Sequence, residues 1–446
     1  MPFIPNTDSD RRQMLAVIGK PSVESLFEDI PKALRYPELD LPPALSEMEI
    51  LREIEALAAK NLSSSTCAWF LGAGAYNHFI PSLVPAIASR GEFLSAYTPY
   101  QPEVSQGTLQ AIFEYQSMAG SLFGVEAMNA SHYDGATALA EAVLMAARNA
   151  PGRDTVLLPA ALHPEYKEVI RTYLEPLDVK IREYTGTPAA AAASLDPTAA
   201  CLVAAYPDFE GRVHDLSGVA DAVHAAGALL VVHADPILLG LFKSPGELGA
   251  DIVTAEGQAL GNAMNYGGPF LGMMGAASKY VRKMPGRIAG QATDAQGRRG
   301  FVLTLSAREQ HIRREKALSN ICSNQGLVML QACIYLATLG KIGLRKVAEL
   351  CWHKAHYAAA EIAKLPGFSV TKDIFFKEFL VKTPVPAQSI YDKLSRRCVV
   401  PGLPLSRYWP DRTHELLVCV TEMNTKEQID LLAASLFFHV FHQLLI

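Results

Sequence analysis

What this 446-residue sequence lacks excludes several functional classes. Its formal net charge is −5 and the sequence contains no long Lys/Arg cluster, so electrostatics gives no support for nucleic-acid binding. No group of His, Cys, Asp and Glu has metal-site spacing, and no Gly-x-Ser-x-Gly nucleophile elbow occurs. The seven cysteines are scattered without a CxxC pair, which predicts reduced thiols in a cytoplasmic protein.

Long uninterrupted apolar runs are also lacking. The first residues have neither a basic start nor an apolar core, so we expect no signal peptide. Residues 229–242 are interrupted by His233, Asp235 and Pro236. Residues 429–446 are more apolar, but polar side chains divide them, and a packed terminal helix is favoured over a membrane anchor. We therefore expect a soluble protein.

Strand and helix patterns alternate from about residue 107 onward. Short apolar strands are predicted at 155–158, 179–184, 201–205 and 229–232, with helices at 135–149, 164–174 and 219–226. Such alternation predicts an α/β fold whose mostly parallel sheet is covered on both faces.

The flanking regions suggest two further parts. We expect an N-terminal arm of small helices over 1–95, which should pack on another surface of this chain or of a partner. The large α/β domain then spans 96–320. A helical link and a small α+β domain occupy 321–446, where a capping-box signal at Thr425 opens the last helix.

The strand ending at Asp235 carries a second informative absence. An acid at the end of such a buried strand can pair with the pyridinium nitrogen of pyridoxal phosphate, and His233 can stack on its ring. The next segment, 249–269, contains no lysine to form a Schiff base. Lys243 and Lys279 do not restore the site. The two residues are therefore interpreted as satisfied polar groups at a strand end.

The densest polar and aromatic run in the chain is 97–107, with the sequence Tyr-Thr-Pro-Tyr-Gln-Pro-Glu-Val-Ser-Gln-Gly. Its two prolines fix the backbone and present the side chains between them with little entropy to lose. Composition alone favours an ordered turn entering the next helix. The candidate binding residues in this run are Tyr97, Tyr100, Gln101, Glu103 and Gln106.

A helix N-terminus follows Asp134. The free N–H groups near Gly135 and Thr137 suit a phosphate, but Asp134 can cap those donors and repel an anion, so capping is the favoured role. The run 308–316 mixes both charge signs at helical spacing, which predicts a solvated helix with i,i+4 pairs.

Several segments closely resemble the glycine decarboxylase P-protein family of the glycine cleavage system. They are Met14–Gly19, Tyr97–Gly107, Asn129–Ser131, Arg308–Lys316 and Ser319–Cys322. The chain resembles the N-terminal half of the long form of that enzyme, made separately as the lysine-less subunit 1. The resemblance implies a fold-type-I pyridoxal-phosphate architecture and a partner, subunit 2, that carries the cofactor; none is covalently bound here.

The resemblance also implies a reaction and a site. Glycine is decarboxylated and its aminomethyl group passes to the lipoyl disulfide of H-protein, an oxidoreductase reaction, in a heteromer expected to contain two copies of each subunit. The run 97–106 then forms a wall of the shared active site, and 308–316 lies at the subunit boundary. Asp134, Gly135, Thr137, His233 and Asp235 would belong to a vestigial cofactor pocket, and no residue is the catalytic lysine.

Two alternatives come from other functional classes. The chain can be a non-catalytic scaffold that stabilises subunit 2 or docks H-protein. It can also be an autonomous pyridoxal-phosphate enzyme that uses Lys243 or Lys279 as its anchor.

Overall fold

A computed structural model describes residues 5–94 and 98–444. The chain divides into two compact units, residues 1–61 and 62–446. The boundaries proposed from the sequence, 1–95, 96–320 and 321–446, differ from this division. The three-domain organisation stays a prediction.

The first unit contains two α-helices that are made by local signals. Helix α1 (Asp8–Ile18) begins with a capping box at Thr7 and ends where Gly19 takes a left-handed conformation. Helix α2 (Glu47–Ala58) begins with a second capping box at Ser46. Between these helices the chain forms two 3₁₀ turns, η1 (Glu24–Phe27) and η2 (Lys32–Leu34). Neither α-helix buries a single residue within this unit.

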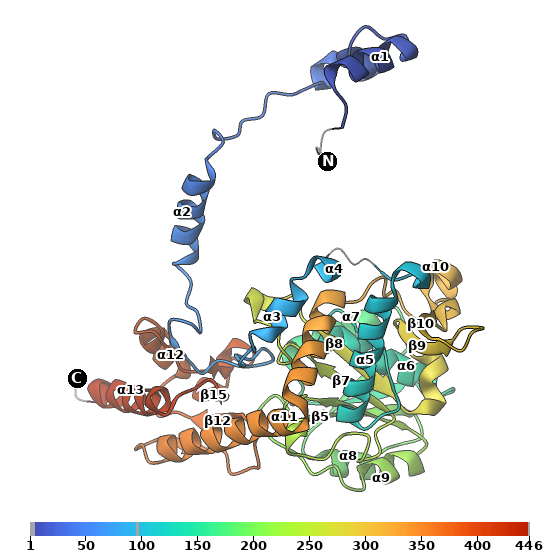
Figure 1. Ribbon diagram of the computed structural model, residues 1–446. Coiled ribbons are helices and arrows are strands. Elements are labelled where there is room, and N and C mark those ends of the chain that lie inside the picture. Colours follow the sequence, from blue (N-terminus) through green and yellow to red (C-terminus); the bar gives the residue numbers. More distant parts are fainter. Residues whose placement is uncertain (1–4, 95–97, 445–446) are drawn as a thin grey trace. The chain divides into compact units, whose positions relative to one another are not determined.

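A seven-stranded sheet, of which β5, β7 and β8 are labelled in Figure 1, forms the centre of the second unit. Its strand order is β2-β8-β7-β6-β5-β3-β4. The strands are β2 (Ala127–Met128), β3 (Thr155–Pro159), β4 (Lys180–Tyr184), β5 (Ala199–Tyr206), β6 (Leu229–Ala234), β7 (Ile252–Glu256) and β8 (Gly272–Ala276). Strands β4, β3, β5, β6 and β7 are parallel, whereas β8 is antiparallel to both of its neighbours. The mostly parallel sheet is confirmed, but strands β2, β7 and β8 were not predicted.

Helices cover both faces of this sheet, as its apolar strands require. Alternate residues of β5 enter different cores: Leu202 joins the core that includes α5, α9 and α11, and Val203 joins the core that includes α6 and α7. The helices packed around the sheet are α3 (Leu83–Ala88), α4 (Gly91–Leu94), α5 (Gln106–Phe123), α6 (Gly135–Arg148), α7 (Pro164–Leu174), α8 (Pro188–Ala193), α9 (Val219–Ala225) and α11 (Gly326–Ala363).

A four-stranded antiparallel sheet, ordered β11-β12-β15-β14, builds the small domain. Its elements are β11 (Ser369–Val370), β12 (Glu378–Lys382), α12 (Ala387–Ser395), β14 (Leu403–Pro404), β15 (Glu415–Cys419) and α13 (Lys426–Leu444). Two short strands, β1 (Ala68–Trp69) and β13 (Val399–Val400), pair in parallel beside it. The predicted capping box of α13 is present, since Gln428 N–H donates to the Thr425 hydroxyl and Thr425 N–H to the Gln428 side chain.

The long helix α11 is apolar enough to cross a membrane by length and composition. Half of its most apolar stretch is buried inside the protein, and Gly340 interrupts its helical geometry. Residues before the break, such as Met329, belong to the core of the large sheet, and residues after it, such as Ala358, to the core of the small domain. The helix therefore connects two cores of a globular unit. Ile429 and Leu432 of α13 are likewise buried, as expected of a packed terminal helix.

Candidate functional site

The predicted cofactor pocket lies beyond the carboxyl end of β6, where Asp235 follows the strand. Its Oδ2 lies 2.6 Å from Nζ of Lys377, the residue directly before β12 of the small domain. The Lys377 side chain is 1% exposed and the Asp235 side chain 8%. Burial opposes both charges, but their pairing outweighs it, so the pKa of Asp235 is lowered and that of Lys377 is raised. Asp235 therefore already has a cationic partner, supplied by this chain.

Lys377 begins a buried hydrogen-bond chain. Its ammonium lies 3.5 Å from the centre of the Tyr76 ring and 3.0 Å from Nε2 of His78. An ammonium has only donors, so Nε2 must accept and Nδ1 must carry the proton that it shares with Glu422 Oε2 at 2.7 Å. The Cys351 thiol lies 3.3 Å from the same Oε2. This assignment leaves no ring lone pair on His78 for a metal.

His78, Cys351 and Glu422 are nevertheless the one group with metal-binding geometry among residues 5–94 and 98–444. Burial raises the pKa of the Cys351 thiol well above its usual range. A thiol and a protonated ring nitrogen are poor ligands, because metals bind the deprotonated forms. The cluster therefore acts as a closed structural network.

The phosphate position is also filled. Asp134 caps α6 by accepting the Thr137 N–H at 2.8 Å. The Gly135 N–H donates to Glu256 Oε2 at 2.8 Å. Burial raises the pKa of Glu256 to about 8, although backbone N–H groups, including that of Leu271, partly offset the effect. A β-carbon on Gly135 would lie 2.8 Å from Glu256, so the Glu256 side chain packs directly against the first residue of the helix.

The cavity between Asp235 and Glu256 is too small for a cofactor. Its volume is about 70 Å³, whereas ligand pockets typically measure about 300–1,000 Å³. His163 and Tyr166 stack over one side at 4.7 Å, and the edge of His233 meets Tyr166. Burial lowers the pKa of His233 to about 4, so the ring is neutral, and its Nδ1 pairs with the Thr254 hydroxyl at 3.0 Å. The residues around Asp235 and Glu256 therefore do not fit pyridoxal phosphate.

The two lysines considered as alternative anchors lie elsewhere. Lys279 pairs with Asp251, which precedes β7 and therefore lies at the opposite edge of the parallel strands from Asp235. Lys243 is exposed. Lys377 is a lysine that pairs with Asp235, and it was missed because 142 residues of sequence separate the two. The sequence feature that could have indicated this buried lysine is the Lys-Glu pair within the apolar run Phe375–Phe379.

The second predicted region, 97–106, contributes an exposed surface. Tyr97 lies outside the described residues. Tyr100 is 47% exposed, and its hydroxyl accepts a hydrogen bond from Arg287 at 2.8 Å. Gln101 and Glu103 are exposed at the turn η3 (Pro102–Val104). Gln106 serves a structural role, since its amide bonds both the N–H and the carbonyl of Phe301.

Phe301 belongs to an unpredicted hairpin, β9 (Ile288–Thr293) and β10 (Arg299–Thr304). The segment after it was predicted as one charged helix, and that prediction is wrong. It consists of η7 (Ser306–Arg308), α10 (Gln310–Arg313) and η8 (Arg314–Lys316), with Arg314 at φ 53°. No i,i+4 ion pair forms within it among the described contacts, because Glu309 instead faces buried Arg287 at 3.4 Å.

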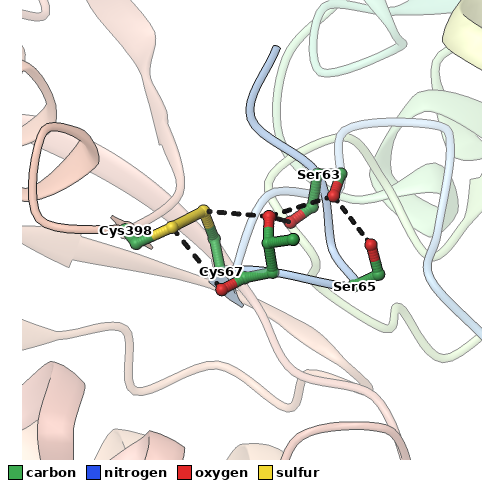
Figure 2. The surroundings of a disulfide bond; sticks show 5 residues. Ser63, Ser65, Cys67 and Cys398 are labelled. Carbon is green, nitrogen blue, oxygen red and sulfur yellow. Dashed lines mark hydrogen bonds between the residues drawn. A yellow bond between two sulfur atoms is a disulfide. The ribbon is translucent and has the colours of Figure 1, made fainter. Parts of the chain in front are cut away.

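The cysteines depart from the expectation that all are reduced. Cys67 and Cys398, which directly precede the paired strands β1 and β13, form a disulfide, although 331 residues separate them in sequence (Figure 2). Figure 2 also shows the turn before Cys67, where the Ser63 hydroxyl bonds Ser65 and Thr66. The pairing could not be read from spacing, because it depends on the parallel contact of two strands from distant parts of the chain.

Comparison with known proteins decides the family. The model described as "Glycine cleavage system P-protein" matches residues 1–436. The chain belongs to the glycine cleavage system P-protein family. A "probable glycine dehydrogenase (decarboxylating) subunit 1" from Thermomicrobium roseum is 52% identical over 98% of this chain and 99% of the relative. A protein of the same name from Desulforamulus reducens is 50% identical over the same shares.

Solved structures support the same assignment of this P-protein family member. A crystal structure titled as glycine decarboxylase (P-protein) of the glycine cleavage system, in inhibitor-bound form, matches with a TM-score of 0.90 and 42% identity. It covers 98% of this chain and 100% of that chain. A sphingosine-1-phosphate lyase from Burkholderia pseudomallei matches over 93% and 95% of the two chains with a TM-score of 0.65, but at 16% identity it shows the fold alone. The fold-type-I architecture is thus confirmed.

Proposed function

We propose that this chain is subunit 1 of a glycine decarboxylase of the glycine cleavage system. Together with a pyridoxal-phosphate-bearing subunit 2, it decarboxylates glycine and transfers the aminomethyl group to the lipoyl group of H-protein, in the cytoplasm. The names of the relatives and the nearly full-length match support this proposal.

One observation carries the assignment of the cofactor to the partner. The Asp235 carboxylate, which would face a pyridinium nitrogen, is paired with Lys377 at 2.6 Å. Glu256 accepts the Gly135 N–H that a phosphate would need. Binding a cofactor in this chain would strand a buried ammonium and displace a buried carboxyl, both of which are costly.

The first unit supports assembly with a partner. Helices α1 and α2 bury none of their side chains within it, and apolar residues such as Val17, Ile54 and Leu57 are exposed by half or more. An unsupported amphipathic helix gains most of its stability from packing. The proposed assembly contains two copies of each subunit.

The exposed loop supports a contribution to a shared active site. In this proposal, Tyr100, Gln101 and Glu103 face the site of subunit 2, and Gln106 holds the loop against the β9–β10 hairpin. Tyr97 is proposed to contribute to the same site. Asp134, Gly135, Thr137, His233 and Asp235 retain only structural roles.

Co-purification with subunit 2, followed by glycine-dependent release of carbon dioxide, tests the function. We expect release from the pair and none from this chain alone. Absence of both association and release would contradict the proposal. Borohydride treatment of the isolated chain with pyridoxal phosphate should trap no lysine adduct, and a specifically trapped lysine would favour an autonomous enzyme.

Loop variants distinguish a shared site from a scaffold. Substitution of Tyr97 and Tyr100 with Phe should lower turnover in an assembled complex without dissociating it. Tyr391→Phe, on α12 of the small domain, is the matched control. Unchanged turnover of the double variant would favour the scaffold.

A further inference from the structure

Arg287 joins three segments that the sequence left unconnected. One of its Nη2 hydrogens is donated to the Tyr100 hydroxyl at 2.8 Å and another to the Cys322 carbonyl at 2.5 Å. Its Nε lies 3.4 Å from Glu309 Oε2. The loop 98–106, the segment 306–316 and the residues around Cys322 therefore meet at one guanidinium.

The burial of this group makes the arrangement specific. Arg287 is 4% exposed, and the Glu309 side chain is 9% exposed. A buried guanidinium requires its acceptors, because leaving it unpaired costs its full desolvation. Ala130 N–H also bonds the Arg287 carbonyl at 2.7 Å, so the backbone that carries the side chain is held.

Arg287 orients Tyr100 in two ways, by the hydrogen bond to its hydroxyl and by a cation–π contact with its ring. The guanidinium carbon lies 5.3 Å from the ring centre. The His311 ring also contacts the Tyr100 ring, in a T-shaped arrangement at 5.7 Å between centres. Because the Tyr100 oxygen accepts from Arg287, its own hydrogen must point to another acceptor. The exposed ring is thus fixed, with a donor available outside this cluster.

We infer that Arg287 is a positioning residue for the shared active site, acting through Tyr100. This inference rests on the proposed function. A lysine at this position keeps the charge but loses the planar, multi-donor group that reaches Tyr100 and Cys322 together. A positive charge alone is therefore insufficient to hold Tyr100 in position.

The test uses the complex reconstituted with subunit 2 and measures kcat and KM for glycine-dependent carbon dioxide release, with assembly followed by light scattering. Arg287→Lys should lower kcat/KM roughly tenfold while the complex remains assembled. Tyr100→Phe should have a similar effect, and the double variant should be no worse than either single one. Arg298→Lys, on the exposed turn of the same hairpin, should match the wild type.

Independent, multiplying losses in the double variant would overturn the inference, as would wild-type activity of Arg287→Lys. Both results require an active wild-type complex, whereas failure of the proposed function would leave that complex inactive. If Arg287→Lys does not fold, Tyr100→Phe alone decides: an assembled complex with unchanged kcat/KM refutes the role, and a loss near tenfold supports it.

Discussion

The Lys377 ammonium lies 2.6 Å from the Asp235 carboxylate, and the pair joins the small domain to the carboxyl end of the large sheet. A cofactor enzyme of this fold would use such a carboxylate to hold a pyridinium nitrogen. Here, a lysine side chain supplies the positive charge. The pocket has therefore become part of the interior packing, with Tyr76 and His78 completing the surroundings of Lys377.

Removing the Lys377 charge should destabilise the chain strongly. Lys377→Met leaves Asp235 buried without its partner, and breaking a buried pair in this way costs about 3–5 kcal/mol. The measurement is the free energy of unfolding in urea. Lys382→Met, at an exposed position of the same strand β12, is the control and should change little. Equal free energies of unfolding for the two variants would show that the Lys377–Asp235 pair does not contribute this stability.

His132 should make stability depend on pH. It is 1% exposed, burial lowers its pKa to about 3, and its Nε2 lies 2.7 Å from the Asn129 amide nitrogen, which donates to it. The unfolded pKa is about 6.5. A group with a lowered folded pKa contributes full stability above its unfolded pKa, so this contribution should be lost as pH falls from about 6.5 toward 3.

The slope of the free energy of unfolding against pH tests whether His132 is the residue responsible. Each pKa unit corresponds to about 1.4 kcal/mol, and unfolding should take up about one proton more at pH 5 because of His132. Urea denaturation at several pH values compares the wild type with His132→Gln, which should lose that proton. His353→Gln, at an exposed position of α11, should keep this proton uptake. An unchanged slope in His132→Gln would contradict the assignment.

The disulfide should contribute measurably to stability. Closing a loop of 331 residues restricts the unfolded chain, and disulfides typically contribute about 2–4 kcal/mol. Cys67→Ser should lower the Tm of oxidised protein to that of protein treated with reductant. Cys322→Ser removes an exposed free thiol and should not alter the response to reductant. Non-reduced peptide mapping that finds Cys67 and Cys398 unlinked in oxidised protein would refute the bond.

Gly211 should tolerate no side chain. Its φ is +85°, and a β-carbon there would lie 2.0 Å from the Glu378 carbonyl oxygen, so Gly211→Ala combines strain with a backbone clash. Gly186 has the same φ but faces open space, so Gly186→Ala should cost only the left-handed strain of about 1–2 kcal/mol. Thermal unfolding of both variants measures the difference, which vanishes if the close approach is absent.

Much of the large domain was predictable because its signals are local. Helix α7 occupies the predicted range 164–174, and Asp134 caps α6 as expected. Strand β5 begins two residues before its predicted range and ends one residue after it, because an uninterrupted apolar run does not mark where pairing stops. The charged run 308–316 failed as a helix, since its Glu309 faces Arg287 and His311 rather than a residue four positions along the chain.

The sequence by itself determined the helix caps, the alternation that builds a parallel sheet, and the missing lysine after Asp235. Only the tertiary structure decided which group replaced the cofactor, because the partner of a buried charge is chosen by distance in space. Lys377, Arg287 and the Cys67–Cys398 bond all connect residues far apart in the chain. No local pattern encodes such contacts, since they exist only after the sheets and helices have packed.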